Sequence, residues 1–286
     1  MKTSSEHYMQ RRTLGVIAFC CIAAAVAGCG KRSHEPAAVQ ASAPEAPVQA
    51  AVVPDPVVRN FDTKATKLPE DFNASVPTDV FDAITRVNTE QRGKFESEAK
   101  YMARMRALSG SVLYSQVRLD GGFAFRPTIE HLTIQYDADK EFFTFELRPD
   151  CVNERNNCNA IEVENRSADK AEFPYINDYF AEKRKSVKHT KRIYLEAPTL
   201  RSLGYIVGRI KATPEAAKKM DGSLGILLVG RILPPFTSTH IDYPHDANED
   251  EVKHQKIIRF SLEGVWLVNH HTRQILSKSW TIKKMI

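Results

Sequence analysis

The chain has 286 residues, of which 42% are hydrophobic and 26% are charged, a composition that is ordinary for a globular protein. Its formal net charge of +5 is too small a basic excess to indicate a nucleic-acid-binding protein. The N-terminal quarter does not look globular. The remaining stretch of about 210 residues is long enough to bury one sizeable core.

Residues 1–28 have the composition of an export signal. A polar start ends in Arg11-Arg12, and an uncharged run of 13 residues follows from Leu14 to Val26. A membrane-spanning helix needs about 20 apolar residues to cross the hydrocarbon core. The run is too short for that and is typical of the apolar region of a signal peptide.

Small residues follow this apolar run, and the segment Val26-Ala27-Gly28-Cys29 resembles the lipobox of bacterial lipoproteins. The resemblance implies cleavage between Gly28 and Cys29 by the lipoprotein signal peptidase. It also implies lipid attachment at Cys29, with acyl chains such as palmitate. Two or three chains anchor stably, because each buried methylene contributes about 0.8 kcal/mol. The alternatives are an uncleaved anchor and a plain signal peptide.

The residues next to Cys29 bear on the membrane in which the anchor sits. In lipoproteins of two-membrane envelopes, an Asp directly after the cysteine favours retention at the inner membrane, whereas Gly30 and Lys31 stand here. For such a host, the resemblance implies the periplasmic face of the outer membrane. Gln10–Leu14 faintly resembles a twin-arginine signal without its usual Phe, so we expect general secretory export, with the twin-arginine route as the alternative.

Residues 29–74 are rich in Ala, Pro and Val and show no sustained apolar period. Recurrent prolines interrupt any helix. We expect the lipidated cysteine to be followed by a disordered tether. The globular periplasmic domain should then span residues 75–286.

The globular part should begin with helices. Val80, Ile84 and Val87 recur at helical spacing after Pro77, and a second helical stretch runs from Lys94 to Leu108. A short helix with Pro at its first turn is expected near residues 213–219.

From residue 112 the apolar pattern changes to a period of two, which is typical of strands. A hairpin is expected over 132–147, central strands over 203–210 and 224–233, a long strand over 258–268, a turn at 269–273 and a last strand over 274–282. The fold class is therefore α+β: an N-terminal helical segment followed by a mainly antiparallel β-sheet or sandwich, with about eight to ten strands.

Five cysteines are present, and Cys20 and Cys21 leave with the signal peptide. Apart from Cys29, this leaves Cys151 and Cys158, an even pair in an exported domain, which predicts a structural disulfide. Closing a loop of this size contributes about 2.5 kcal/mol in the chain-entropy model. The spacing is not that of a redox-active C-x-x-C pair.

The richest polar stretch runs from His240 to His254. It carries residue types that bind zinc, but the spacing matches no zinc motif. A calcium loop starting at Asp246 fails because Glu251 stands where Gly is needed and Ile257 where Glu is needed. We therefore predict a solvated surface loop, and neither a metal site nor a cofactor.

No catalytic motif is evident. His270 and His271 are adjacent, which fits a turn better than catalysis, and G-x-S-x-G is absent. Glycines within the strand patterns indicate bulges or close backbone packing rather than a phosphate loop; they are Gly204, Gly208, Gly225 and Gly230.

A basic run extends from Lys183 to Arg192, and residues 178–188 could be helical. It is either a solvated face or a contact for anionic groups of lipid headgroups, lipopolysaccharide or cell-wall polymer. Our functional expectation is a lipid-anchored envelope lipoprotein whose periplasmic domain binds or scaffolds an envelope partner, and not an enzyme. The alternative is an envelope hydrolase whose site assembles only in three dimensions.

Overall fold

The computed structural model describes residues 58–88, 92–152, 158–176, 182–200, 204–243 and 251–284. The chain divides into two compact units at residue 53, and every described residue belongs to the second unit. Cys29 and the predicted signal peptide lie outside the described residues.

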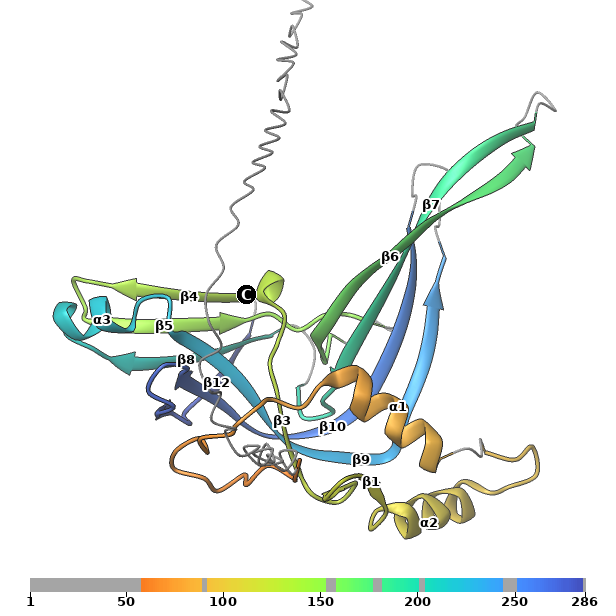
Figure 1. Ribbon diagram of the computed structural model, residues 1–286, viewed down its shortest axis with the longest axis horizontal. Coiled ribbons are helices and arrows are strands. Elements are labelled where there is room, and N and C mark those ends of the chain that lie inside the picture. The colour runs from red at the N-terminus through yellow and green to blue at the C-terminus, as the bar shows by residue number, and fades with distance from the viewer. Residues whose placement is uncertain are drawn as a thin grey trace, which may run out of the picture. The chain divides into compact units, whose positions relative to one another are not determined.

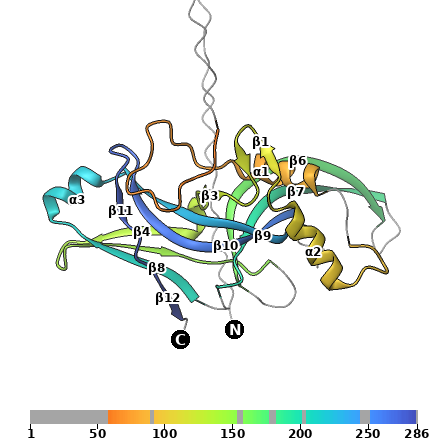
Figure 2. The ribbon, with the colours of Figure 1, turned by 90° about the horizontal axis from the view of Figure 1, so that it is seen from below.

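Three α-helices are found among the described residues: α1 (Pro77–Val87), α2 (Glu98–Leu108) and α3 (Pro214–Met220). All three were predicted from the sequence. The second begins at Glu98 because the Ser97 side chain accepts a hydrogen bond from the backbone N–H of Lys100, at 3.3 Å. Figure 2 shows α3 at the opposite end of the fold from α1 and α2.

The strands dominate the fold. They are β1 (Val112–Tyr114), β2 (Val117–Arg118), β3 (Gly122–Phe125), β4 (Leu132–Asp137), β5 (Phe142–Leu147), β6 (Ala160–Ile176), β7 (Glu182–Glu196), β8 (Gly204–Lys211), β9 (Leu224–Asp242), β10 (Glu251–Asn269), β11 (Ile275–Ser277) and β12 (Thr281–Lys284). A single-turn 3-10 helix, η1 (Ile129–His131), precedes β4.

Two main sheets are built from these strands (Figure 1). The larger has the order β3-β9-β10-β7-β6, with β11 also pairing with β10, and the smaller has the order β12-β8-β5-β4. Among the described strands of these two sheets, the pairing of β7 with β10 is parallel and the others are antiparallel. A sheet-dominated fold with few helices is therefore confirmed.

The core lies where α1 packs on the larger sheet. Val80, Phe81 and Ile84 of α1 join a buried cluster that includes Ile193 and Leu195 of β7. The sheet also fastens the start of the helix. Glu164 of β6 accepts a hydrogen bond from the backbone N–H of Thr78 at 3.1 Å, which places a carboxylate at the positive end of α1.

Residues 58–74 do not continue the tether that the sequence predicted. Leu68 is buried, and Phe61 packs edge-on against Phe72 and against Trp266 of β10, at 5.3 Å between ring centroids in both pairs. The backbone N–H of Phe61 also donates to Gly122 at 2.8 Å. The packed part therefore starts well before residue 75.

Two other predictions need correction. A helix was considered possible for the stretch 178–188, but its described residues 182–188 lie in β7, where they pair with β6 and Lys188 also pairs with β10. The expected last strand is divided into β11 and β12, which pair with different sheets.

Candidate functional site

A cluster of polar side chains lies on the face of the larger sheet that points away from α1. Along β7, Ile193 and Leu195 face the core, so the alternate residues Arg192 and Tyr194 face the other side. Glu162 of β6 is in register with Tyr194, which brings it to the same face. Gln255 of β10 is in register with Arg192, and both Glu162 and Gln255 are buried.

Glu162 is the centre of this polar cluster. It is only 1% exposed. Its Oε2 atom accepts hydrogen bonds from Nη1 of Arg192 and from the hydroxyl of Tyr194, both at 3.3 Å. Its Oε1 atom is buried without a hydrogen-bond partner. The guanidinium of Arg192 is shared, because its Nη2 atom also lies 3.6 Å from Glu251.

The turn η1 brings two further groups to Glu162. The backbone N–H of Thr128 donates to the backbone oxygen of Glu162 at 2.9 Å, which fixes the start of this turn beside β6. One ligand atom each from Glu130, His131 and Glu162 then lie within 4.8 Å of one another. Nε2 of His131 also lies 3.6 Å from Oδ2 of Asp150.

The surroundings of this cluster shift several pKa values. Burial, together with the nearby charge of Glu162, raises the pKa of Asp150 despite the opposing effect of His131. Burial and the same carboxylate also raise the pKa of Tyr194, so this phenol stays protonated. Burial opposes the charged form of Glu251, but a hydrogen bond from Thr190 and the charge of Arg192 outweigh it and lower the pKa of Glu251.

Unpaired polar atoms gather at this cluster. Among the described residues, seven buried side-chain atoms lack a hydrogen-bond partner, and five of them belong to its members. These five are Oγ1 of Thr128, Oδ2 of Asp150, Oε1 of Glu162, Nε of Arg192 and Oε1 of Gln255. Buried polar groups are normally satisfied, so such a concentration indicates a place where a ligand completes the network. Four of the five are oxygen atoms, which favours a ligand that is a cation or a hydrogen-bond donor.

A small recess of about 160 Å³ opens onto the cluster, and Glu130 and His131 line it together with Arg148 and Tyr205. Residues from 58–76 make up half of the lining of a recess of about 450 Å³ and most of the lining of one of about 620 Å³. We place the candidate site at the polar cluster because the unpaired buried atoms gather there, and because Glu130 and His131 of the cluster also line the small recess.

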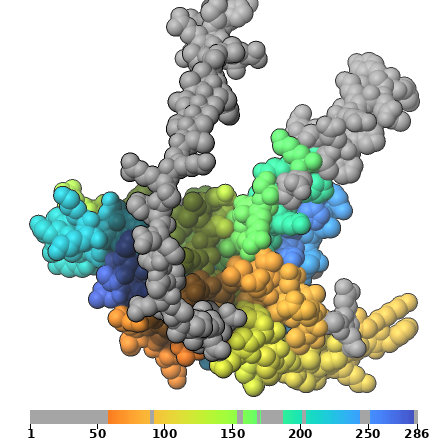
Figure 3. All heavy atoms as spheres, viewed as in Figure 1, coloured from red at the N-terminus to blue at the C-terminus, as the bar shows by residue number. Residues whose placement is uncertain are grey.

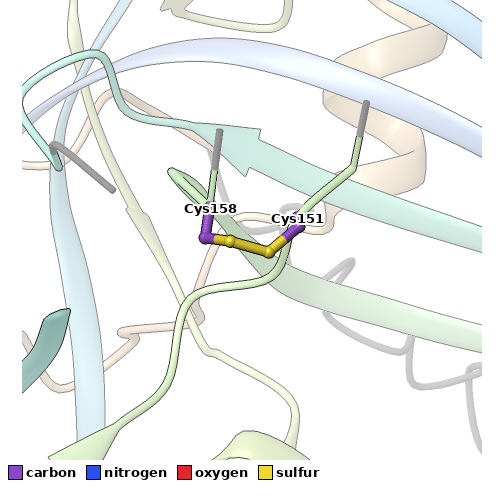
Figure 4. The surroundings of a disulfide bond; sticks show 2 residues. All are labelled: Cys151 and Cys158. Carbon is purple, nitrogen blue, oxygen red and sulfur yellow. A yellow bond between two sulfur atoms is a disulfide. The ribbon is translucent and has the colours of Figure 1, made fainter. Parts of the chain in front are cut away.

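The cysteine pair borders the site. The sulfur atoms of Cys151 and Cys158 lie at bonding distance, with their Cα atoms 3.9 Å apart (Figure 4). Asp150 directly precedes this pair, and its backbone N–H donates to Ala160 at the start of β6, at 2.6 Å. The loop between the cysteines thus starts and ends beside the site.

The polar stretch from His240 to His254 is not the single surface loop that the sequence predicted. His240 lies on β9 and His254 on β10, where its Nε2 atom is 2.9 Å from Nδ1 of His189. His245, Asp246 and Asp250 lie outside the described residues. Glu251 contacts the site through Arg192.

The adjacent histidines lie where the sequence placed them, in the turn after β10. Oδ1 of Asn269 accepts hydrogen bonds from the backbone N–H groups of His271 and Thr272, both at 2.9 Å, which holds the turn. The prediction of close packing at strand glycines is also confirmed. A side chain at Gly230 would meet the backbone oxygen of Ser261.

The sequence analysis did not single out Glu130, His131 or Glu162. They come from two distant segments, and neither segment has a recognisable ligand spacing. The available signal was Glu162 itself, a carboxylate between Ile161 and Val163 in an apolar strand.

No protein-family model, curated protein or solved structure matches this chain. Within the described ranges, no helix is both long and apolar enough to span a membrane.

Proposed function

We propose that the protein is a lipid-anchored envelope module, held by Cys29, whose periplasmic domain binds an anionic envelope surface. The supporting observation is a two-stranded ribbon. Among the described residues, β10 begins beside β7 at Glu251, opposite Lys188. Beyond that point, within the described ranges, residues 171–176 of β6 and 182–187 of β7 pair with each other.

The composition of the ribbon favours anionic lipid. From Glu182 to Lys188 the sequence of β7 has four Lys or Arg residues and one Glu, and residues 171–176 of β6 include Phe173 and Tyr175. Basic residues gain about 1 kcal/mol each at an anionic membrane surface, and aromatic residues favour the membrane interface. Figure 3 shows the base of β6 and β7, in green, beside β10, in blue.

A vesicle-tethering experiment tests this proposal without interference from the anchor. The full chain is reconstituted into phosphatidylcholine vesicles, and capture of a second, labelled population is measured by sedimentation. We expect capture of phosphatidylglycerol vesicles and not of phosphatidylcholine vesicles. Replacing Lys183, Arg184 and Lys185 with Gln should reduce capture at least about tenfold.

The matched control is the double variant Lys218→Gln and Lys219→Gln on α3, which removes exposed charges far from the ribbon. It should capture vesicles like the wild type. Equal loss in both variants, or equal capture of both vesicle types, would contradict the proposal.

A hydrolase is the second candidate function. The observation in its favour is the pairing of His131 with Asp150 beside Glu162, since a carboxylate-oriented imidazole can act as a general base. Turnover of a cell-wall or lipid substrate by the wild type, lost in His131→Gln, would reverse our ranking.

As to fold class, we propose an α+β domain in which helices precede a mainly antiparallel sheet assembly.

A further inference from the structure

We propose that Glu130, His131 and Glu162 bind a divalent transition-metal ion. Their ligand atoms lie within 4.8 Å of one another. Ligand atoms around one such ion lie roughly 3–4 Å apart, given metal–ligand distances of about 2.0–2.2 Å. The three ligand atoms would therefore have to move only slightly closer together to bind one ion. The side chain of Glu130 can make this movement, because it is exposed on the single-turn helix η1.

The buried carboxylate of Glu162 points independently to a ligand. Arg192 and Tyr194 both bond to Oε2, which leaves Oε1 as the atom that a cation would contact. An unpartnered charged oxygen in the interior costs more free energy than an exposed one. A metal ion on Oε1 would remove that cost.

The charge of the cluster has the sign that a cation requires. Glu130, Asp150 and Glu162 are three carboxylates, whereas the guanidiniums beside them are two: that of Arg192, which is shared with Glu251, and that of Arg148, which lines the recess. The cluster is therefore short of positive charge, and a divalent ion would supply it.

The donor set indicates the class of ion. One imidazole with two carboxylates suits Zn²⁺ or Mn²⁺ better than Ca²⁺ or Mg²⁺, which prefer oxygen ligands alone. Asp150 lies against Nε2 of His131 at 3.6 Å. This distance is longer than a hydrogen bond, and a slightly closer approach would let Asp150 orient a ligating imidazole.

Direct metal binding tests the proposal. The full chain is purified in detergent, stripped with EDTA and titrated with Mn²⁺, whose free ion is followed by electron paramagnetic resonance. Zn²⁺ is then added as a competitor. We expect one tight Mn²⁺ site from which Zn²⁺ displaces the ion, and at least about a hundredfold weaker binding in His131→Gln and Glu162→Gln. Asp150→Asn should weaken binding about 10–100-fold.

The control variant is Glu263→Gln, which removes a surface carboxylate paired with Arg231 and should leave affinity unchanged. If Glu162→Gln does not fold, Glu130→Gln on the exposed turn gives the same comparison. Absence of a tight site in the wild type, or unchanged affinity in the folded His131 and Glu130 variants, would overturn the proposal.

Discussion

Glu162 and Arg192 meet across β6 and β7 on the face of the larger sheet that points away from α1, with Oε2 and Nη1 3.3 Å apart. The glutamate side chain is fully buried, whereas the arginine side chain is 22% exposed. The pair satisfies one carboxylate oxygen and leaves the other unpartnered. It is thus a half-completed network, in which Oε1 of Glu162 still lacks a hydrogen-bond partner.

Removing the guanidinium should destabilise the fold strongly. In Arg192→Leu the buried charge of Glu162 loses its nearest counter-charge, and breaking a buried pair in this way costs about 3–5 kcal/mol. Urea denaturation measures the change in free energy of unfolding. The control is Arg231→Leu, whose partner Glu263 lies on the surface with 51% and 37% of the two side chains exposed. That change should cost at most about 1 kcal/mol, and equal losses would contradict our view of the site.

Gly230 of β9 should tolerate no side chain. A Cβ there would meet the backbone oxygen of Ser261 and the ring of Phe260, so Gly230→Ala should cost about 1–3 kcal/mol through overpacking. Gly93 is the matched control, because its nearest neighbour would be the Cβ of Glu96 at an ordinary 3.6 Å. Gly93→Ala should be neutral or stabilising by up to about 1 kcal/mol. Thermal denaturation compares the two variants. A higher melting temperature for Gly230→Ala than for Gly93→Ala would contradict this prediction.

Stability should fall when the pH drops through the histidine range. Burial and the charge of Arg126 lower the pKa of His270 below its ordinary 6.5. Between this lowered pKa and 6.5, the unfolded chain binds more protons than the folded chain, so stability rises with pH across that window and is lost on acidification. The melting temperature of His270→Gln should depend less on pH there than that of the wild type. Parallel curves for the two proteins would refute the assignment.

The cysteine pair should stabilise the loop beside the site. Replacing Cys151 and Cys158 with Ser should lower the free energy of unfolding by about 2.5 kcal/mol under oxidising conditions. Reductant should remove the difference between the two proteins. Because Asp150 precedes the loop, metal affinity should also fall in the variant. A thiol titration that finds both cysteines free in protein isolated from the envelope would contradict this prediction.

Anchoring depends on Cys29. Cells that express Cys29→Ala should incorporate no labelled palmitate into the protein, whereas the wild type should be labelled and should begin at Cys29. A Cys20→Ala change in the apolar run is the control and should leave labelling intact, since that residue leaves with the signal peptide. Persistent labelling of Cys29→Ala, or a mature chain that still begins at Met1, would defeat the lipoprotein assignment.

Local patterns predicted much of the fold. The helices after Pro77 and before Leu108 follow from apolar spacing, and the hairpin of β4 and β5 follows from alternation around polar turn residues. These elements are decided by neighbours close in sequence, which is why the pattern sufficed.

Long-range pairing could not be predicted in the same way. The basic stretch of β7 has no apolar alternation, and it is a strand because β6 and β10 pair with it from either side. Phe61 and Phe72 likewise resemble isolated apolar residues in a linker, and they join a buried cluster through residues far along the chain, among them Trp266.

The candidate site shows the same limit more clearly. Long-range contacts bring Glu130 and His131 to Glu162, among them the backbone hydrogen bond from Thr128 to Glu162 of β6. No spacing rule in the sequence reports such a contact. The sequence does show the carboxylate of Glu162 within an apolar strand, but the strand register decides which residues this side chain meets.

Anomalous diffraction at the zinc edge, from crystals of the full chain grown with Zn²⁺, is the most direct test of metal binding at this cluster. We expect a peak in contact with Glu130, His131 and Oε1 of Glu162, with Asp150 against the imidazole. A well-ordered site with these three side chains and no peak between them, or zinc bound only at other residues, would contradict it.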